Sequence, residues 1–176
     1  VAALSSDTAP VLIALGATLR VAGAEGRREL PVAALYNTDG LAHTNLVAGE
    51  MITSVRVPIP ASDTRLTYRK WAVRKSIDFP LVSVATRLDL DDTGNIAGGV
   101  LVVSVLGPKP RVLKLDKFAG RPIDPALAAD LGEMAFKRCK PLPNVPYDAG
   151  YRRDRLRVEV TRSIRSLVAG NEASGK

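Results

Sequence analysis

The sequence predicts an α+β fold: an antiparallel sheet of three to four strands packed on a three-helix bundle, preceded by the end of a smaller α+β domain. Two observations predict it. Strand-like segments joined by short connections occupy residues 51–106, and helix-like segments follow them to about residue 168. Parallel pairing would require a crossover between successive strands, so strands that follow one another directly favour antiparallel pairing with helices on one face.

The first expected element is a short helix in SSDTAPVLIALGA. Ser6 or Asp7 can cap its start, Pro10 fits its first turn, and Gly16 can end it. The next segments, TLRVAG and RRELPV, are separated only by AEG and predict a hairpin.

Four further strands are expected before the helices. EMITSVRVPIP alternates between apolar and polar residues and ends at its prolines. Three strands then follow at about Leu66–Val73, Leu81–Leu90 and Ile96–Leu106. The composition of DDTGN, between the last two, predicts a hairpin turn.

Three helices are expected in the last third, near Arg111–Phe118, Asp124–Lys140 and Asp148–Val168. Asp124 followed by proline is a favourable helix start, and KPLPNVP is a clear stop.

The prolines between Pro58 and Pro60 mark the expected domain boundary. We therefore expect the end of one domain in residues 1–60, a second domain in residues 61–170, and a tail in residues 171–176. The chain opens with an apolar stretch and no initiator methionine, so we expect residue 1 to be an arbitrary cut in a longer protein.

Composition excludes several classes of protein. No run of eighteen apolar residues is present, which excludes a membrane-spanning helix. The single cysteine, Cys139, cannot form an intrachain disulfide, and with the single histidine, His43, it argues against structural zinc and a Cys-His nucleophile pair. Cys139 is interpreted as a helix-end residue rather than a reactive thiol. A reducing, cytoplasmic location is expected.

The net charge of +7 is concentrated at the C-terminal end, where residues 111–176 hold 14 basic and 8 acidic side chains. Arg153, Arg157 and Arg165 can lie beside an apolar helix face there. A solvated basic face is the simpler interpretation, and an anionic partner is the alternative. Nucleic acid is disfavoured, because aromatic residues make up only 5% of the chain and do not alternate with the cations.

The residues alone indicate no catalytic site. We find no phosphate-binding glycine fingerprint, no paired nucleophile and base, and no metal-ligand spacing. The carboxylates of Asp89–Asp92 fall in the expected hairpin turn, where solvated turn residues are the simpler interpretation.

Three segments in register carry a family resemblance: SSDTAPVLIALGA, GEMITSVRVP and YRKWAVRKSIDFPLVSVA. Together they resemble the FAD-binding subunit of the molybdenum hydroxylases, the family of xanthine dehydrogenase, carbon monoxide dehydrogenase and 4-hydroxybenzoyl-CoA reductase. LYNTDGLAHTNLVAGE and YDAGYRRDRLRV look most like the flavoprotein subunit of 4-hydroxybenzoyl-CoA reductase. The resemblance runs from Ser5 to about Leu167. It implies an FAD-binding domain followed by a C-terminal domain like that of the carbon monoxide dehydrogenase flavoprotein.

The resemblance implies four flavin-site residues. Asp7 matches an aspartate that hydrogen-bonds the FAD ribityl or pyrophosphate region, and a helix N-cap is the structural alternative. Ile52 matches an aliphatic residue that lies against the isoalloxazine, with a core strand position as the alternative. Lys70 matches a lysine that reaches the flavin edge, where a cation would stabilise negative charge on the reduced ring. Asp78 matches an acidic position on a loop beside the flavin, and a salt bridge to Arg74 is its alternative.

The other cations of the third segment, Arg69, Arg74 and Lys75, would line the flavin loop or face a neighbouring subunit. The family's glycine-rich pyrophosphate loops would precede Val1, so the chain alone is expected to bind FAD poorly.

The resemblance also implies partners. Electrons would pass between a molybdenum cofactor in a large subunit, [2Fe-2S] clusters in a small subunit, and FAD held partly on this chain. Substrate chemistry would belong to the molybdenum subunit, so no catalytic residue is expected here. A hypothesis from a different class stays open: a non-catalytic basic module that binds an acidic protein partner or nucleic acid.

Overall fold

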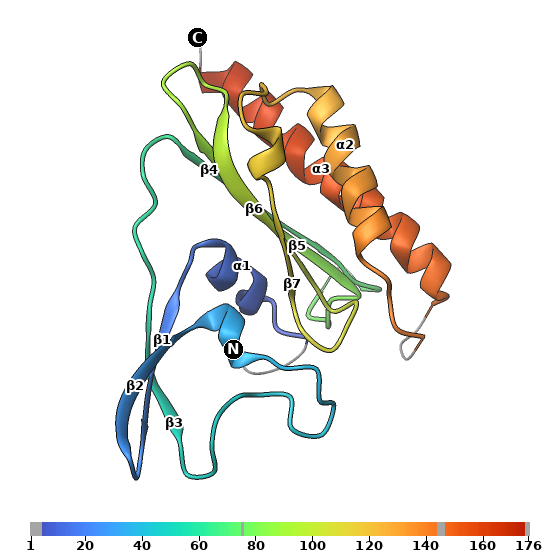
Figure 1. The fold of residues 1–176 in the computed structure, drawn as a ribbon. Coiled ribbons are helices and arrows are strands. Elements are labelled where there is room, and N and C mark those ends of the chain that lie inside the picture. Colours follow the sequence, from blue (N-terminus) through green and yellow to red (C-terminus); the bar gives the residue numbers. More distant parts are fainter. Residues whose placement is uncertain (1–4, 75, 144–146, 175–176) are drawn as a thin grey trace.

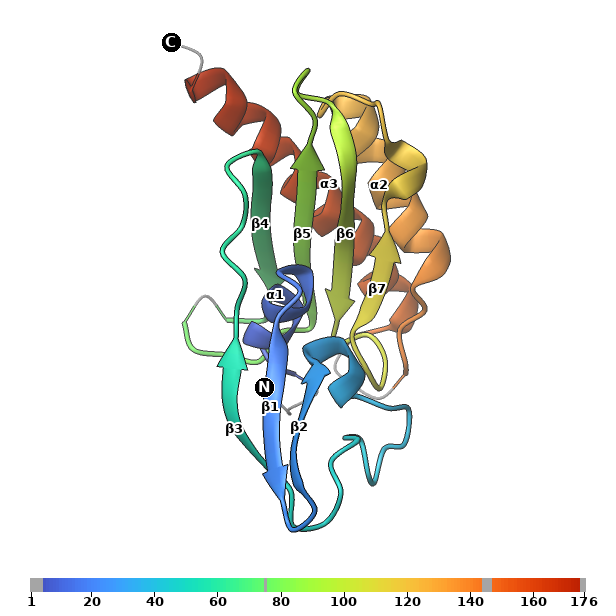
Figure 2. The same ribbon diagram turned by 60° about the vertical axis from the view of Figure 1, so that its left-hand side comes forward.

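A computed structural model describes residues 5–74, 76–143 and 147–174, with side chains up to residue 168. The chain forms a three-stranded sheet and a four-stranded sheet (Figure 1). Two long helices cover one face of the four-stranded sheet, and the short helix α1 lies on the other face (Figure 2). The α+β class with antiparallel sheets is therefore confirmed.

The N-terminal part builds the smaller sheet, whose strand order is β2-β1-β3. Its elements are α1 (Thr8–Ala14), β1 (Thr18–Gly23), β2 (Gly26–Pro31), the 3-10 turn η1 (Val32–Leu35) and β3 (Met51–Arg56). The expected helix, hairpin and strand are all present.

The C-terminal part builds the larger sheet, whose strand order is β4-β5-β6-β7 with every pair antiparallel. Its strands are β4 (Thr64–Trp71), β5 (Val82–Leu90), β6 (Ile96–Ser104) and β7 (Arg111–Lys114). Because neighbouring strands alternate in direction, β4 and β6 end at the same edge of the sheet at which β5 and β7 begin.

One expected helix is absent. The segment 111–118 forms strand β7 and a 3-10 turn, η2 (Asp116–Phe118), instead of a helix. The apolar residues Leu113 and Leu115 are buried and Lys114 is exposed, which is the period of a strand. Pairing of Val102 with Val112 extends the sheet by this strand, so the prediction of a helix here was wrong.

Two helices therefore pack on the large sheet, α2 (Pro125–Arg138) and α3 (Ala149–Ser174). Asp124 caps α2 as expected, because its Oδ1 accepts the backbone N–H of Leu127 at 2.6 Å. The last helix ends at Ser174 rather than near Val168, so the start of the expected tail is helical.

The two hydrophobic cores lie on opposite faces of the four-stranded sheet. Val84 of β5 and Val103 of β6 belong to the core under α2 and α3. Their strand neighbours Ala85 and Val102 belong to the core that α1 and the small sheet share. The two parts of the chain are thus packed on one sheet, while the division near residue 60 stays a prediction.

Candidate functional site

Strand β4 sorts the charged residues of the segment YRKW onto two faces of the sheet. Tyr68 lies opposite Ala85 and Lys70 opposite Ser83, so both point to the α1 face. Arg69 lies opposite Val84 and points to the α3 face. Alternation along one strand therefore gives neighbouring cations different partners.

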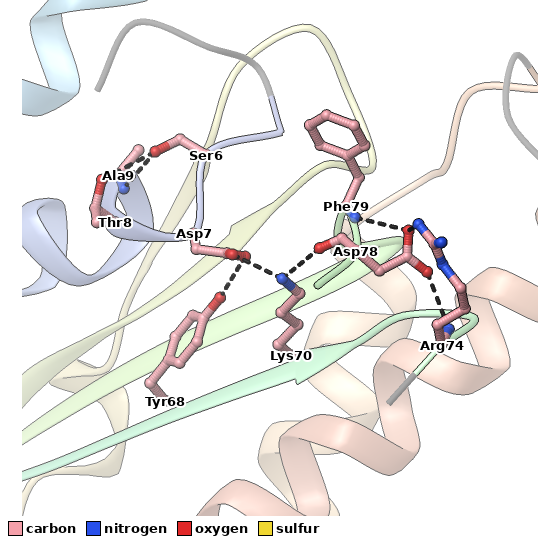
Figure 3. Close-up of polar contacts among 9 residues, drawn as sticks. All are labelled: Ser6, Asp7, Thr8, Ala9, Tyr68, Lys70, Arg74, Asp78 and Phe79. Atoms are coloured by element: carbon pink, nitrogen blue, oxygen red, sulfur yellow. Dashed lines mark hydrogen bonds and ion pairs between the residues drawn. The ribbon is translucent and has the colours of Figure 1, made fainter. Parts of the chain in front are cut away.

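Lys70 lies at the centre of a polar cluster between β4, α1 and the β4–β5 connection (Figure 3). Its Nζ donates to Oδ2 of Asp7 at 2.7 Å and to the backbone carbonyl of Asp78 at 2.6 Å. The hydroxyl of Tyr68 donates to the other oxygen of Asp7, Oδ1, at 3.0 Å. Asp7, Tyr68, Lys70 and Asp78 are called the Lys70 cluster below.

Asp7 is available for this cluster because another residue caps α1. The Asp7 side chain makes no capping hydrogen bond, and the backbone N–H of Ala9 donates to Oγ of Ser6 at 3.1 Å instead. The carboxylate of Asp7 is 46% exposed and the Lys70 side chain 27% exposed, so a ligand can reach both groups.

Tyr68 remains a neutral hydrogen-bond donor in this setting. Burial of the phenol, followed by the hydrogen bond to Asp7 and the charge of Asp7, raises the pKa of Tyr68. Since the ordinary pKa of tyrosine is already far above neutrality, the hydroxyl keeps its proton at physiological pH.

Asp78 contributes its backbone carbonyl to the cluster and turns its carboxylate toward Arg74. Oδ2 accepts the backbone N–H of Arg74 at 2.9 Å, and Oδ1 lies 3.4 Å from Nη2 of Arg74. These interactions lower the pKa of Asp78, and the hydrogen bond from the backbone N–H of Arg74 has the largest effect. The salt bridge that was the structural alternative for Asp78 is therefore present.

Arg69 was expected to line the flavin loop or to face a neighbouring subunit, but it lies on the α3 face of the sheet instead. Its Nε donates to Oε2 of Glu159 on α3 at 2.7 Å, and Glu159 is buried. Arg155 and Arg162 also form ion pairs with the carboxylate of Glu159. Arg74 pairs with Asp78, and Lys75 lies outside the described residues.

Ile52 occupies a different place from the other candidates. It lies in β3 opposite Val21 and packs, half-buried, against the core of the N-terminal part. The structure thus brings Asp7, Lys70 and Asp78 together and leaves Ile52 in the small sheet. Sequence reasoning missed Tyr68, although its position two residues before Lys70 in a strand is a signal that both share a face.

A pocket of about 470 Å³ opens at the same edge of the large sheet. Its walls come from the β6–β7 connection, the end of α2 with the residues that follow, and Thr38 of the N-terminal part. Three cations line it, Lys109, Arg111 and Lys140, and the described residues contribute no acidic side chain to its lining.

Cys139 is buried at the end of α2, and burial raises the pKa of its thiol to about 11. This agrees with a structural rather than a reactive cysteine. Among the residues that the structure describes, no group of histidine, cysteine and acidic side chains could hold a metal ion. No described helix has both the length and the apolar character needed to cross a membrane.

Two arginines of α3 have partners within the chain. Arg153 lies 4.0 Å from the ring centre of Phe136 and donates to the Phe136 carbonyl. Arg157 pairs with Asp154 and Glu133. These contacts favour the simpler interpretation of the basic C-terminal face.

Sequence comparisons point to flavin-binding proteins. Residues 1–60 match a family model described as the FAD binding domain in molybdopterin dehydrogenase. The chain is 26% identical over 171 residues to the glyceraldehyde dehydrogenase medium chain of Sulfolobus acidocaldarius, a match that covers 93% of this chain and 57% of that protein. It is 36% identical over 100 residues to the aldehyde oxidoreductase FAD-binding subunit PaoB of Escherichia coli, covering 54% of this chain and 31% of that protein. The chain spans just over half the length of the first relative.

Solved structures share the fold. A chain of quinoline 2-oxidoreductase from Pseudomonas putida 86 superposes with a TM-score of 0.81 at 24% identity, covering 96% of this chain and 58% of that one. A chain of carbon monoxide dehydrogenase from Hydrogenophaga pseudoflava, in a form lacking the Mo-pyranopterin moiety, gives 0.82 at 20% identity with the same coverage. At these identities the likeness establishes a common fold.

Proposed function

We propose that this chain is part of the FAD-binding subunit of a molybdenum-dependent hydroxylase or dehydrogenase. In this role it helps to hold the FAD that exchanges electrons with iron–sulfur clusters. One observation carries the proposal: the ion pair between Asp7 and Lys70 joins a segment that matches an FAD-binding domain to the first strand of the following sheet.

The side chains of the Lys70 cluster fit part of a flavin. The Asp7 carboxylate can accept hydrogen bonds from ribityl hydroxyls, and the Lys70 ammonium can face negative charge on the ring. The Tyr68 hydroxyl is a neutral donor beside them. We propose Ile52 as an apolar contact of the ring and Asp78 as a residue of the loop beside it. FAD itself would supply the reversible redox chemistry, while these groups would orient it and influence its potential.

The partners follow from the same proposal. A large subunit would hold the molybdenum cofactor and a small subunit the [2Fe-2S] clusters, in a cytoplasmic complex. The finer assignment to an enzyme like 4-hydroxybenzoyl-CoA reductase is supported by the segments LYNTDGLAHTNLVAGE and YDAGYRRDRLRV. Substrate chemistry would take place on the large subunit, so this chain would contribute no catalytic residue.

The test uses the complete subunit that contains this chain, purified with its partner subunits. We expect bound flavin, visible as the yellow absorbance of the oxidised cofactor. Lys70→Ala should weaken FAD binding by about tenfold, because a charge-assisted hydrogen bond is lost. Lys114→Ala removes an exposed lysine from β7 of the same sheet and should leave FAD binding unchanged.

Two outcomes would overturn the proposal. One is a complete, folded subunit that binds no FAD. The other is equal FAD affinity in the wild type and Lys70→Ala. Salt-sensitive binding of DNA by a colourless complete subunit would favour the basic binding module instead.

A further inference from the structure

Arg152, in the first turn of α3, is fully buried and makes its hydrogen bonds to backbone carbonyls. Its Nη1 donates to the carbonyl of Leu142 at 3.1 Å. Its Nη2 donates to the carbonyls of Leu81 at 3.3 Å and Val105 at 3.0 Å. No carboxylate of the described residues pairs with it.

A buried cation without an anionic partner is costly. Burial lowers the pKa of Arg152, yet a guanidinium keeps its proton in proteins. Elsewhere this chain buries charge differently, since the buried carboxylate of Glu159 has arginine partners. An apolar side chain would avoid this cost but would leave three backbone carbonyls without the donors that Arg152 supplies.

The three carbonyls belong to three different connections at one edge of the large sheet. Leu81 ends the β4–β5 connection, Val105 begins the β6–β7 connection, and Leu142 lies in the α2–α3 connection. A direct backbone hydrogen bond joins the β6–β7 and α2–α3 connections, because the N–H of Leu142 donates to the carbonyl of Leu106 at 2.9 Å. Arg152 adds the β4–β5 connection to this pair.

The backbone of Val105, one of the residues that Arg152 contacts, is strained. Its φ angle is 75°, in the left-handed region that β-branched residues rarely adopt. Such a conformation costs on the order of 1–3 kcal/mol and persists only where its surroundings hold it. The hydrogen bond from Arg152 to the Val105 carbonyl is one of the contacts that hold it.

The same connections border the Lys70 cluster and the pocket. The β4–β5 connection carries Asp78, whose carbonyl accepts from Lys70. Leu106 and Leu142 line the 470 Å³ pocket. One guanidinium therefore contacts both the loop beside Lys70 and the connections that form walls of that pocket.

We propose that Arg152 is a positioning residue for the FAD site: from beneath the sheet edge it holds the three bordering connections in one arrangement relative to Lys70. The inference rests on the proposed function. It requires arginine rather than lysine, because only the planar guanidinium presents several donors in a fixed fork.

The test compares Arg152→Lys with Leu156→Ala in the complete subunit. Leu156 lies one turn further along α3 and is equally buried in the core. Arg152→Lys should lower FAD affinity by about tenfold, since small displacements of positioning groups have large effects. Leu156→Ala should lose as much thermal stability or more and keep its FAD affinity within about twofold.

A double variant separates positioning from general destabilisation. Glycine adopts a positive φ without strain, so Val105→Gly should restore part of the FAD affinity lost in Arg152→Lys. In the wild type, hydrogen exchange supplies a measurement that depends on no variant. The amides of Leu81 and Leu142 are hydrogen-bonded, and FAD should slow their exchange together.

Three results would overturn the role of Arg152 while leaving the proposed function intact. The first is a loss of FAD affinity in proportion to lost stability in both single variants. The second is a Val105→Gly double variant that recovers nothing. The third is exchange at Leu81 and Leu142 that does not respond to FAD. A wild-type subunit that binds no FAD would instead overturn the proposed function itself.

Discussion

Lys70 Nζ lies 2.7 Å from Oδ2 of Asp7, although 63 positions of sequence separate the two residues. The pair joins the start of α1 to the end of β4 (Figure 3). An exposed ion pair contributes little to stability, which is a reason to look for its role in binding.

Removal of the Tyr68 hydroxyl should weaken FAD binding in the complete subunit. Tyr68→Phe leaves the ring in place and removes the donor to Asp7 Oδ1, so we expect a loss of about two- to tenfold in FAD affinity. Fluorescence titration with FAD measures it. Tyr151→Phe, which keeps the ring that packs on Trp71, is the control and should bind FAD like the wild type. Equal affinities in the two variants would contradict the prediction.

Glu159 should be among the most sensitive positions for stability. Its carboxylate is 2% exposed and pairs with Arg69, so Glu159→Ala would leave cations without their buried partner. We expect a loss of about 3–5 kcal/mol in the free energy of unfolding, measured by urea denaturation. Glu133→Ala removes an exposed carboxylate that pairs with Lys137 and should cost less than about 1 kcal/mol. Similar losses in both variants would count against a buried ionic junction between β4 and α3.

Glu50 should make stability depend on pH in the acidic range. The pKa of Glu50 is lowered to about 2, and the two hydrogen bonds from Arg28 are the largest cause. Because the folded pKa lies below the unfolded one, the unfolded chain binds more protons between the two values, and stability falls as the pH drops through them. Between pH 5 and pH 2, roughly the interval between the unfolded and folded pKa values of Glu50, the melting temperature should therefore fall less in Glu50→Gln than in the wild type. Parallel pH profiles would refute this.

Two substitutions test which face of strand β7 packs on the core. Leu113 is buried and Val112 is 41% exposed, as alternation in a strand requires. Leu113→Ala should lower the free energy of unfolding by about 2–5 kcal/mol. Val112→Ala should have an effect below about 1 kcal/mol. Equal effects in urea denaturation would contradict this burial of Leu113 and exposure of Val112.

Most elements of the fold could be predicted because their signals are local. The proline and cap of α2, the alternation in β3 and the apolar runs of β5 and β6 lie within each segment. The prediction of a helix in residues 111–118 was wrong because the signal that decides this segment is not local. Its apolar residues also suit a helix, and only pairing with β6, distant in sequence, selects the strand.

For the site, the sequence by itself determined the α+β class, the resemblance to flavin-binding subunits and the candidates Asp7, Lys70 and Asp78. Only the tertiary structure decided which groups meet. Because side chains alternate along β4, Lys70 contacts Asp7 on one face of the sheet and Arg69 contacts the buried Glu159 on the other. The packing of α3 places Arg152 where it hydrogen-bonds to three connections. The contacts of Arg69 with Glu159, Lys70 with Asp7 and Arg152 with Val105 join residues 47 to 90 positions apart. No local pattern encodes such contacts, because sheet pairing and helix packing set them.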